Sequence, residues 1–292
     1  MNLGTIMREG APVIVQGLTG RQGRRHAGLM RAFGTNVVGG VSPNVDRESV
    51  DGLPVFPDCA AAVAATGAVA SVVMVRPEST AEAVIEAVSA GIDVIVSVAE
   101  GMRTLDSLRA LREVRRAGAV WIGPSTPGMA IPGNRLKLGF LPNASLLPGP
   151  VGIMSRSGTL SYEVGYRLAA RGIGQSVWIG VGGDPVKGTR FAELAPFFHQ
   201  DDATRALIVI GEIGGNEEEE FAATIEADGF GKPVFAIVAG GGAPEGVTMG
   251  HAGALVHGPH GAVETKRMAF EAAGVTVCPT IEALVDTVEA SI

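Results

Sequence analysis

The sequence has few aromatic residues, few cysteines and no long apolar run. Only 5% of its 292 residues are aromatic, and Cys59 and Cys278 lack the close pairing of a metal knuckle or a redox motif. We therefore expect two reduced, buried thiols and no metal site. No run of about 18 apolar residues occurs, and residues 1–10 contain no apolar core. We predict neither a membrane span nor export, and a cytoplasmic location.

The charge balance is acidic. The formal net charge is -7 and the pI is about 5.3, so the chain has no overall positive field with which to hold nucleic acid or an anionic membrane. We expect neither as a partner. An anionic ligand would have to be bound by a local arrangement of donors.

Small and apolar residues dominate the composition. The hydrophobic fraction is 46%, and glycine accounts for 42 residues, which is typical of strands buried on both faces beneath helices rich in small residues. A chain of this length is sufficient for two α/β domains of ordinary size. We therefore predict two domains.

Short β-rich runs alternate with helical stretches over residues 1–125. This alternation predicts a parallel, doubly wound sheet, and so a Rossmann-like first domain. The expected strands are Val13–Gln16, Val37–Val41, Ala70–Val75, Val94–Val98 and Val120–Ile122, and the expected helices are Arg24–Phe33, Ala60–Ala65, Thr80–Ala90 and Thr104–Ala117.

Residues 126–150 are interpreted as a proline- and glycine-rich connection. This region has neither a helical nor a strand period, and its prolines would interrupt regular elements. The alternation resumes over residues 151–292 and predicts a flavodoxin-like second domain. Its expected strands are Val151–Met154, Ser176–Ile179, Ala206–Ile210, Val234–Val238 and Val275–Val277, with helices that include Leu160–Ala170 and Glu217–Ala227.

The start of the helix Glu217–Ala227 carries a run of four glutamates. Asn216 is the expected N-cap, and negative charge on the first turn is favoured by the helix dipole. We interpret the charge run as structural.

A glycine-rich loop, Gly17–Gly23, follows the first expected strand and opens a helix. Its backbone amides can converge on a phosphate without interference from side chains. The spacing is G-x-x-G-x-x-G, and the second strand ends in Val-Val-Gly-Gly-Val without the acidic residue that binds a ribose hydroxyl in NAD sites. The loop alone is compatible with a nucleotide-type ligand or with a tight turn, but both departures count against NAD.

One of the five histidines lies in a context that suits a nucleophile. His251 is surrounded by small residues, which leave its ring accessible to a second molecule. A neutral imidazole can accept a phosphoryl group on one nitrogen if an acceptor holds the other. Glu212 directly follows an apolar strand, at the edge where α/β active sites gather, and is the candidate orienter. From the local sequence alone, a helix-capping or core histidine is the alternative.

Seven segments spread over both expected domains match one known family in order and spacing: GLTGRQG, VVGGVSP, GLPVF, MSRSGTLSYE, GVGGDPVKGT, GEIGG and MGHAGA. They resemble the α subunits of succinyl-CoA synthetases, which are nucleoside-diphosphate-forming acid–CoA ligases. The resemblance covers nearly the whole chain. It favours the catalytic interpretation of His251 over the structural one.

The resemblance implies a ligase of the tricarboxylic acid cycle that works with a separate ATP-grasp β subunit. Acid, CoA and ATP or GTP would be interconverted with acyl-CoA, phosphate and ADP or GDP through an acyl phosphate and a phosphorylated His251, with the nucleotide and Mg²⁺ bound mainly on the β subunit. Glu212 would orient His251. By the same resemblance, CoA contacts fall on Thr19, Gly20, Arg21, Gln22, Val98, Ala99 and Glu100, phosphoryl contacts on Ser155, Ser157, Gly158 and Thr159, and acid contacts on Tyr162, Ser125 and Thr126.

Three segments depart from the family pattern. Val45 stands where the family usually has a lysine that contacts CoA phosphates, and Arg47, Arg21 or Arg76 is the candidate to compensate. Arg76 replaces the first proline of a Pro-x-Pro segment and has a surface role as its alternative.

The segment Gly-Pro-Ser125-Thr126-Pro-Gly replaces the family's usual Asn-Cys by two hydroxyls. Such an exchange changes the donors and acceptors offered to the acid. Succinate, malate, a sulfonated acid or another short dicarboxylate therefore remain open as substrates. So do ADP against GDP and αβ against α2β2 assembly.

Two other functional classes fit the sequence less well. An NAD-dependent oxidoreductase would need an acidic residue after the second strand. A non-catalytic CoA-binding module would tolerate loss of His251 and Glu212, and the joint presence of these residues disfavours it.

Overall fold

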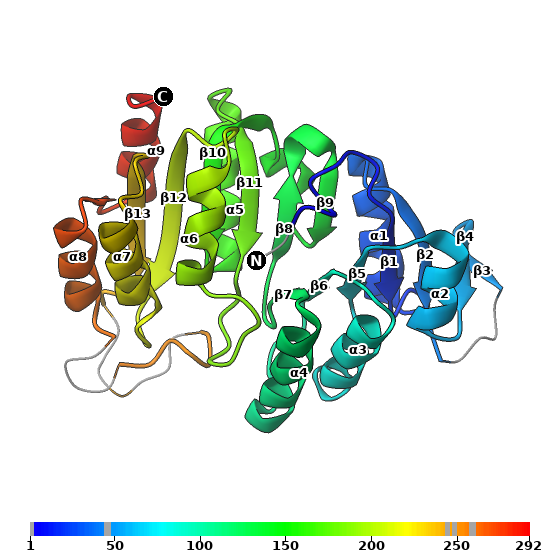
Figure 1. Ribbon diagram of the computed structural model, residues 1–292. Helices are drawn as coiled ribbons and strands as arrows, with labels where there is room; N and C mark the ends of the chain where they lie inside the picture. The colour runs from blue at the N-terminus through cyan, green and yellow to red at the C-terminus, as the bar shows by residue number, and fades with distance from the viewer. Residues whose placement is uncertain (1–2, 44–47, 243–245, 247–249, 257–260) are drawn as a thin grey trace.

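The computed structural model describes residues 3–43, 48–242, 246, 250–256 and 261–292, and contains two largely parallel sheets side by side with helices on their faces (Figure 1). Long apolar runs account for the strands. All four residues of β1 and all seven of β12 are buried, as expected where helices cover both faces of a parallel sheet.

The first sheet has, among the described residues, the strand order β3-β4-β2-β1-β5-β6-β7. Without the short edge strand β3, this is the 3-2-1-4-5-6 order of the Rossmann fold, so the predicted fold class is confirmed. The strands are β1 Val13–Gln16, β2 Val37–Val41, β3 Ser49–Val50, β4 Leu53–Phe56, β5 Ala70–Val73, β6 Val94–Ser97 and β7 Val120–Ile122, and the helices are α1 Arg21–Phe33, α2 Cys59–Thr66, α3 Pro77–Ser89 and α4 Thr104–Ala117.

The second sheet has the order β14-β13-β12-β10-β11-β8-β9. Its parallel part corresponds to the 2-1-3-4-5 order of flavodoxin-like folds, which confirms the predicted class. The strands are β10 Pro148–Ser155, β11 Gln175–Gly180, β12 Ala206–Glu212, β13 Val234–Ala239 and β14 Thr276–Val277, and the helices are α5 Gly158–Ala170, α6 Phe191–Gln200, α7 Glu217–Asp228, α8 Val263–Ala272 and α9 Ile281–Glu289.

Strands β8 (Gly128–Ile131) and β9 (Leu136–Gly139) correct the expectation that residues 126–150 hold no regular element. They form an antiparallel hairpin that joins the edge of the second sheet through β11. Pro127 precedes β8 and Pro132 follows it, so neither proline removes a donor from the ladder. The boundaries 1–125, 126–150 and 151–292 remain a prediction.

The start of α7 also differs from expectation. Asn216 occupies the N-cap position, but its side chain makes no capping hydrogen bond. Its amide instead donates to Glu220 at 2.8 Å. The predicted cap is therefore wrong in its chemistry, although the helix begins where expected.

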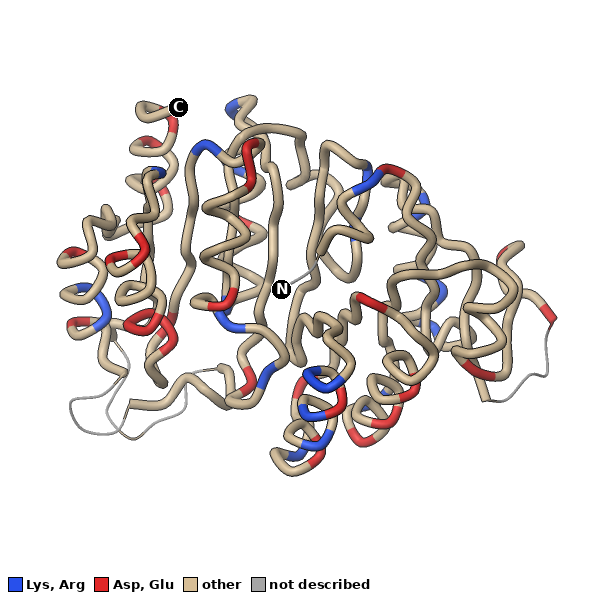
Figure 2. Tube along the Cα trace, viewed as in Figure 1, with Lys and Arg blue, Asp and Glu red and all other residues tan. Residues whose placement is uncertain are grey.

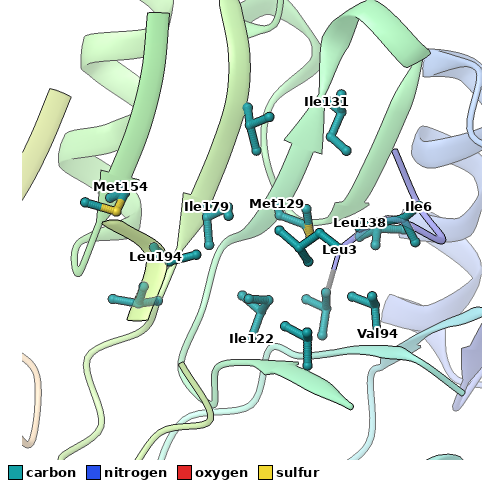
Figure 3. Close-up of a cluster of buried hydrophobic side chains, with 14 of the residues drawn as sticks. Leu3, Ile6, Val94, Ile122, Met129, Ile131, Leu138, Met154, Ile179 and Leu194 are labelled. Carbon is teal, nitrogen blue, oxygen red and sulfur yellow. The ribbon is translucent and has the colours of Figure 1, made fainter. Parts of the chain in front are cut away.

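A continuous apolar core joins the two domains. Figure 3 shows Val94 and Ile122 from the first sheet close to Met129 and Leu138 of the β8–β9 hairpin, and all four belong to one buried cluster. Figure 2 shows that charged residues lie mostly on helices and loops, with few on the strands. Because a shared core resists separation, the loops at the domain junction are held in fixed relative positions.

Each sheet has one topological switch point, where the strand order reverses and a ligand can bind. In the first sheet β2 and β5 flank β1, and in the second β11 and β12 flank β10. The crevice at the carboxyl ends of such strands is the usual ligand site of open α/β sheets. This switch point is next to the glycine loop in the first sheet and between Ser155 and Glu212 in the second.

Candidate functional site

The glycine loop is shaped by contacts that exclude side chains. A Cβ on Gly23 would lie 2.1 Å from the carbonyl oxygen of Gly17, and one on Gly17 would lie 2.7 Å from that of Met74. Gly17 also has a φ of 85°, which glycine adopts without strain. The chain can therefore turn from β1 directly into α1 at this point.

The start of α1 offers unpaired backbone donors. Gly20 is its N-cap and provides no side-chain hydrogen bond to the first turn, so the amides of this turn remain available to an anion. Of the predicted CoA residues in this loop, Gly20, Arg21 and Gln22 are exposed, and Thr19 donates a hydrogen bond to Ser42 at 3.1 Å. The loop has the geometry of an anion cradle.

The second group of predicted CoA residues lies at the same sheet edge. Val98, Ala99 and Glu100 directly follow β6, and the register aligns Gln16 at the end of β1 with Val73 and Ser97. Parallel strands in register deliver their carboxyl ends to one edge. The two predicted CoA segments therefore lie at the same edge of the sheet.

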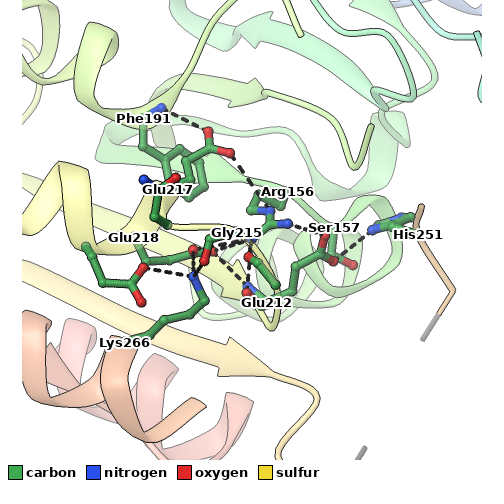
Figure 4. Close-up of polar contacts among 12 residues, drawn as sticks. Arg156, Ser157, Phe191, Glu212, Gly215, Glu217, Glu218, His251 and Lys266 are labelled. Carbon is green, nitrogen blue, oxygen red and sulfur yellow. Dashed lines mark hydrogen bonds and ion pairs between the residues drawn. The ribbon is translucent and has the colours of Figure 1, made fainter. Parts of the chain in front are cut away.

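His251 and Glu212 are in contact, as predicted. His251 Nδ1 lies 2.7 Å from Glu212 Oε2, and the side chains are 24% and 7% exposed, respectively (Figure 4). Because a carboxylate only accepts hydrogen bonds, this contact assigns the proton to Nδ1 and leaves the lone pair of Nε2 as the nucleophile. The half-buried ring remains accessible from one side.

The electrostatics of His251 follow from this contact. The hydrogen bond to Glu212 raises the pKa of His251 above its ordinary value, burial opposes the rise, and the charges of Glu212 and Glu100 add to it. Glu100, in the predicted CoA segment, is thus close enough to influence the histidine electrostatically. The two predicted sites are neighbours.

Sequence reasoning did not single out Arg156, which supports Glu212. Its Nη2 lies 3.2 Å from Glu212 Oε1 in an ion pair whose angles fall outside hydrogen-bond geometry. Its Nη1 donates to the main-chain oxygens of Glu212 at 3.0 Å and Gly214 at 2.9 Å. Arg156 is 3% exposed, so the guanidinium fixes both the carboxylate and its backbone.

The glutamate run at the start of α7 is partly buried beneath this arginine. Glu218 is fully buried and pairs with Arg156 and Lys266 (Figure 4). Glu217 pairs with Lys187 at 2.8 Å. Its helix position alone predicts a structural role for the run. No local signal in the sequence indicates which distant cations it meets.

The residues predicted to contact a phosphoryl group lie at the N-terminus of α5. Ser157 Oγ accepts from the amide of Leu160 at 3.3 Å and caps the helix. Ser155 is buried, and its hydroxyl donates to the carbonyl oxygen of Ser157 at 2.7 Å. This leaves the first-turn amides of Gly158 and Thr159 as donors to an anion. Ser155 acts on the shape of the loop.

One of the predicted acid residues, Tyr162, lies at the same helix end, beside Pro127, which follows Thr126 in the chain. A Cβ on Gly158 would lie 3.6 Å from Pro127 and 3.8 Å from the hydroxyl of Tyr162, and burial raises the pKa of Tyr162. The Thr126 hydroxyl donates to the carbonyl oxygen of Gly180 and accepts from the amide of Gly128. Ser125 is only half-buried, so of these two hydroxyls it is the one that a ligand can reach.

The other histidines lie in different surroundings. His26 packs against Phe140 with ring centroids 4.2 Å apart, and burial together with Lys137 and Arg25 lowers its pKa to about 4. His199 Nδ1 lies 2.7 Å from the carbonyl oxygen of Phe230. His257 and His260 are outside the described residues. Each described alternative is engaged in packing or local bonding.

Of the three arginines proposed to compensate for the missing lysine, the structure describes Arg21 and Arg76. Val45 and Arg47 lie outside the described residues, and Arg21 is exposed at the start of α1. The Arg76 side chain is 86% exposed, 4.0 Å from Glu78.

Within the described part of the chain, no helix is long and apolar enough to cross a membrane, and no group of three or more His, Cys, Asp or Glu residues could hold a metal ion.

Two protein families match the two halves of the chain. The family described as CoA binding domain matches residues 9–101, and the family described as CoA-ligase matches residues 154–276. The first match contains both predicted CoA segments, and the second contains Glu212 and His251.

Relatives extend over nearly the full length. The α subunit 2 of succinate–CoA ligase (ADP-forming) from Archaeoglobus fulgidus is 45% identical, with 94% of this chain and 95% of the relative covered. The α subunit of malate–CoA ligase from Methylorubrum extorquens is 41% identical, with 94% and 93% covered.

A solved structure matches the fold. The ATP citrate lyase of Methanosaeta concilii in complex with (3S)-citryl-CoA gives a TM-score of 0.85 at 22% identity. The match covers 97% of this chain but 49% of the lyase chain, so this chain spans about half of that longer protein. Together with the two family matches and the near full-length relatives, the comparisons show that the chain belongs to the succinate–CoA ligase α-subunit family of acid–CoA ligases.

Proposed function

We propose that this α subunit carries the phosphoryl group of the ligase reaction on His251. The observation that supports this most directly is the 2.7 Å contact between His251 Nδ1 and Glu212 Oε2 at the topological switch point of the second sheet. A carboxylate that holds one ring nitrogen frees the other for attack on phosphorus. Arg156 keeps that carboxylate in place.

The proposed reaction has three steps. Phosphate displaces CoA from acyl-CoA to give an acyl phosphate and the CoA thiol. Nε2 of His251 then attacks the phosphorus, the bond to the acid oxygen breaks, and the free acid leaves. The phosphohistidine finally passes its phosphoryl group to ADP or GDP, which regenerates neutral His251. Each step is reversible, so the same groups serve acyl-CoA synthesis.

The N-terminus of α5 is the proposed binding site of the phosphoryl group. The amides of Gly158 and Thr159 point outward from the first turn, and the helix dipole favours an anion there by about 0.3 to 2 kcal/mol, depending on burial. Ser157 caps the helix and preserves this donor set. CoA is proposed to bind through residues 19–22 at the start of α1 and 98–100 after β6.

The nucleotide is proposed to bind elsewhere. A separate β subunit with an ATP-grasp fold would hold ATP or GTP with Mg²⁺ and receive the phosphoryl group from His251. This chain would supply CoA, acid and phosphohistidine contacts. We expect the isolated chain to bind CoA without catalysing nucleotide-dependent ligation.

Succinate or a related short acid is the proposed substrate. The relatives named for succinate and malate are 45% and 41% identical to this chain, so overall identity does not separate the two acids. Ser125 and Tyr162 border the proposed acid position, and a hydroxyl at Ser125 can donate to an extra polar group on the acid. This feature is the reason to test malate and sulfonated acids beside succinate.

An acid panel tests the proposal. The chain, co-purified with its native partner, is supplied with CoA, ATP or GTP, and each acid, and acyl-CoA formation is followed together with His251 phosphorylation. We expect one short acid to be preferred by tenfold or more, about 1.4 kcal/mol, and His251→Ala to abolish both signals. Acyl-CoA formation by the His251→Ala enzyme would contradict the proposal.

A further inference from the structure

Three loops of the site are linked in series through Gly183, in the loop after β11. The amide of Ser125 donates to the carbonyl oxygen of Ala99 at 2.8 Å, the amide of Gly183 donates to that of Ser125 at 3.3 Å, and the amide of Gly253 donates to that of Gly183 at 3.2 Å. The proposed CoA loop, acid loop and phosphohistidine loop are thus joined by consecutive backbone hydrogen bonds. Gly183 takes part in two of these hydrogen bonds, as donor to Ser125 and as acceptor from Gly253.

The ring of His251 occupies the space that a side chain at position 183 would need. A Cβ on Gly183 would lie 2.4 Å from Cγ, 2.6 Å from Nδ1 and 2.8 Å from Cβ of His251. Separations below 3.0 Å essentially never occur for a real Cβ. Because the His251 Cβ is attached to the backbone, rotation of the ring cannot relieve the overlap, and the loop itself would have to move.

Backbone conformation gives no separate reason for glycine at this position. Gly183 is absent from the residues with positive φ, unlike its neighbour Gly182, so alanine can adopt its conformation. Gly183 is also buried. The close approach of His251 is therefore the feature that excludes a side chain.

We propose that Gly183 is a positioning residue for His251, whose missing side chain allows the imidazole to lie against the backbone with Nδ1 on Glu212. The inference rests on the proposed role of His251. It extends that role by assigning the placement of the ring to the loop that also carries the hydrogen bonds toward the acid and CoA segments.

Gly183→Ala is the primary test, with Gly133→Ala as its matched control. A Cβ on Gly133 meets no atom within 4 Å, and this glycine also lacks a positive φ. We expect Gly183→Ala to slow single-turnover phosphorylation of His251 by about tenfold to hundredfold, because the hydrogen bond to Glu212 is lost. The control should match the wild-type complex, and CoA affinity should be unchanged in both variants.

A histidine titration followed by NMR separates positioning from a general loss of structure. Displacement from Glu212 should lower the pKa of His251, since that hydrogen bond is the main cause of its rise. The stability cost should also depend on the histidine. Gly183→Ala should lower Tm in the wild-type background but not in a His251→Gly background, where the overlapping atoms are absent.

The outcomes distinguish this inference from the proposed function. A wild-type complex that shows no phosphorylation of His251 contradicts the proposed function itself. Normal phosphorylation of the wild-type and Gly183→Ala complexes with an unchanged pKa of His251 contradicts only the positioning role. An equal loss of Tm in both backgrounds would place the overlap elsewhere and also refute it.

Discussion

The contact between His251 and Glu212 leads to a quantitative prediction for Glu212→Gln. The substitution preserves the size of a side chain that is 7% exposed but removes the charge on the partner of Nδ1. It also removes the charge facing Arg156 Nη2 at 3.2 Å. A glutamine can present either its carbonyl oxygen or its amide group to Nδ1, so the histidine lacks the charged, acceptor-only partner that fixes its tautomer.

The expected loss follows from the strength of a hydrogen bond to a charged group. Such a bond contributes about 1.5 to 3 kcal/mol, and each 1.36 kcal/mol corresponds to about a tenfold change in rate. We expect the rate of His251 phosphorylation, measured at a pH where the ring is neutral, to fall by about tenfold to hundredfold.

The pH profile should change in a defined direction. A protonated ring cannot attack phosphorus, and Glu212 raises the pKa of His251, so the acid limb of the wild-type profile should lie above the ordinary histidine pKa of about 6.5. In Glu212→Gln this limb should move to lower pH. The same contact stabilises the fold fully below the unfolded pKa and loses this contribution as pH rises through the folded pKa, so the variant should also lose that pH dependence.

Single-turnover phosphorylation of the α–β complex, measured across pH, is the assay. Glu226→Gln is the matched control, because Glu226 is an exposed glutamate on α7. An unchanged plateau rate with an unmoved acid limb would refute the orienting role of Glu212. A limb that moved to higher pH would refute the electrostatic reasoning.

Three further predictions concern polar side chains. Thr126→Val should lower the free energy of unfolding by about 1 to 3 kcal/mol, because it leaves the carbonyl oxygen of Gly180 without the hydroxyl that donates to it. Ser125→Ala should instead change the ranking of acids by kcat/KM with little change in Tm. A loss of stability in Ser125→Ala with a changed acid ranking in Thr126→Val would contradict the geometry. Lys266→Met should cost about 3 kcal/mol or more in urea unfolding, because it removes one cationic partner of the fully buried Glu218, and a loss below about 1 kcal/mol would show that the pair contributes little.

Strands with continuous apolar sequence were predictable from local pattern. The bounds of β1, β2 and β7 agree with the prediction, because runs such as Val13–Gln16 are buried on both faces. The β8–β9 hairpin was missed because prolines flank its strands, and a count of prolines does not show that they lie outside the ladder. Helix α6 contains Pro196 and was not predicted.

The site was predictable to the extent that its residues follow strand ends. Glu212 ends β12, so its position at the carboxyl edge could be expected from the sequence. The contact of Glu212 with His251 spans 39 residues, and the family resemblance was needed to select this histidine. Arg156 and Lys266 meet the glutamates of α7 only through the tertiary fold, which no periodicity reveals.

Location of the phosphoryl group tests the central claim most directly. The α–β complex is incubated with radiolabelled ATP or GTP, quenched at alkaline pH to preserve phosphohistidine, and digested, and the labelled peptide is sequenced by mass spectrometry. We predict one acid-labile phosphoryl group on His251 of this chain, discharged by the acid together with CoA. A label on another residue, or acyl-CoA formation without a labelled His251, would contradict the account.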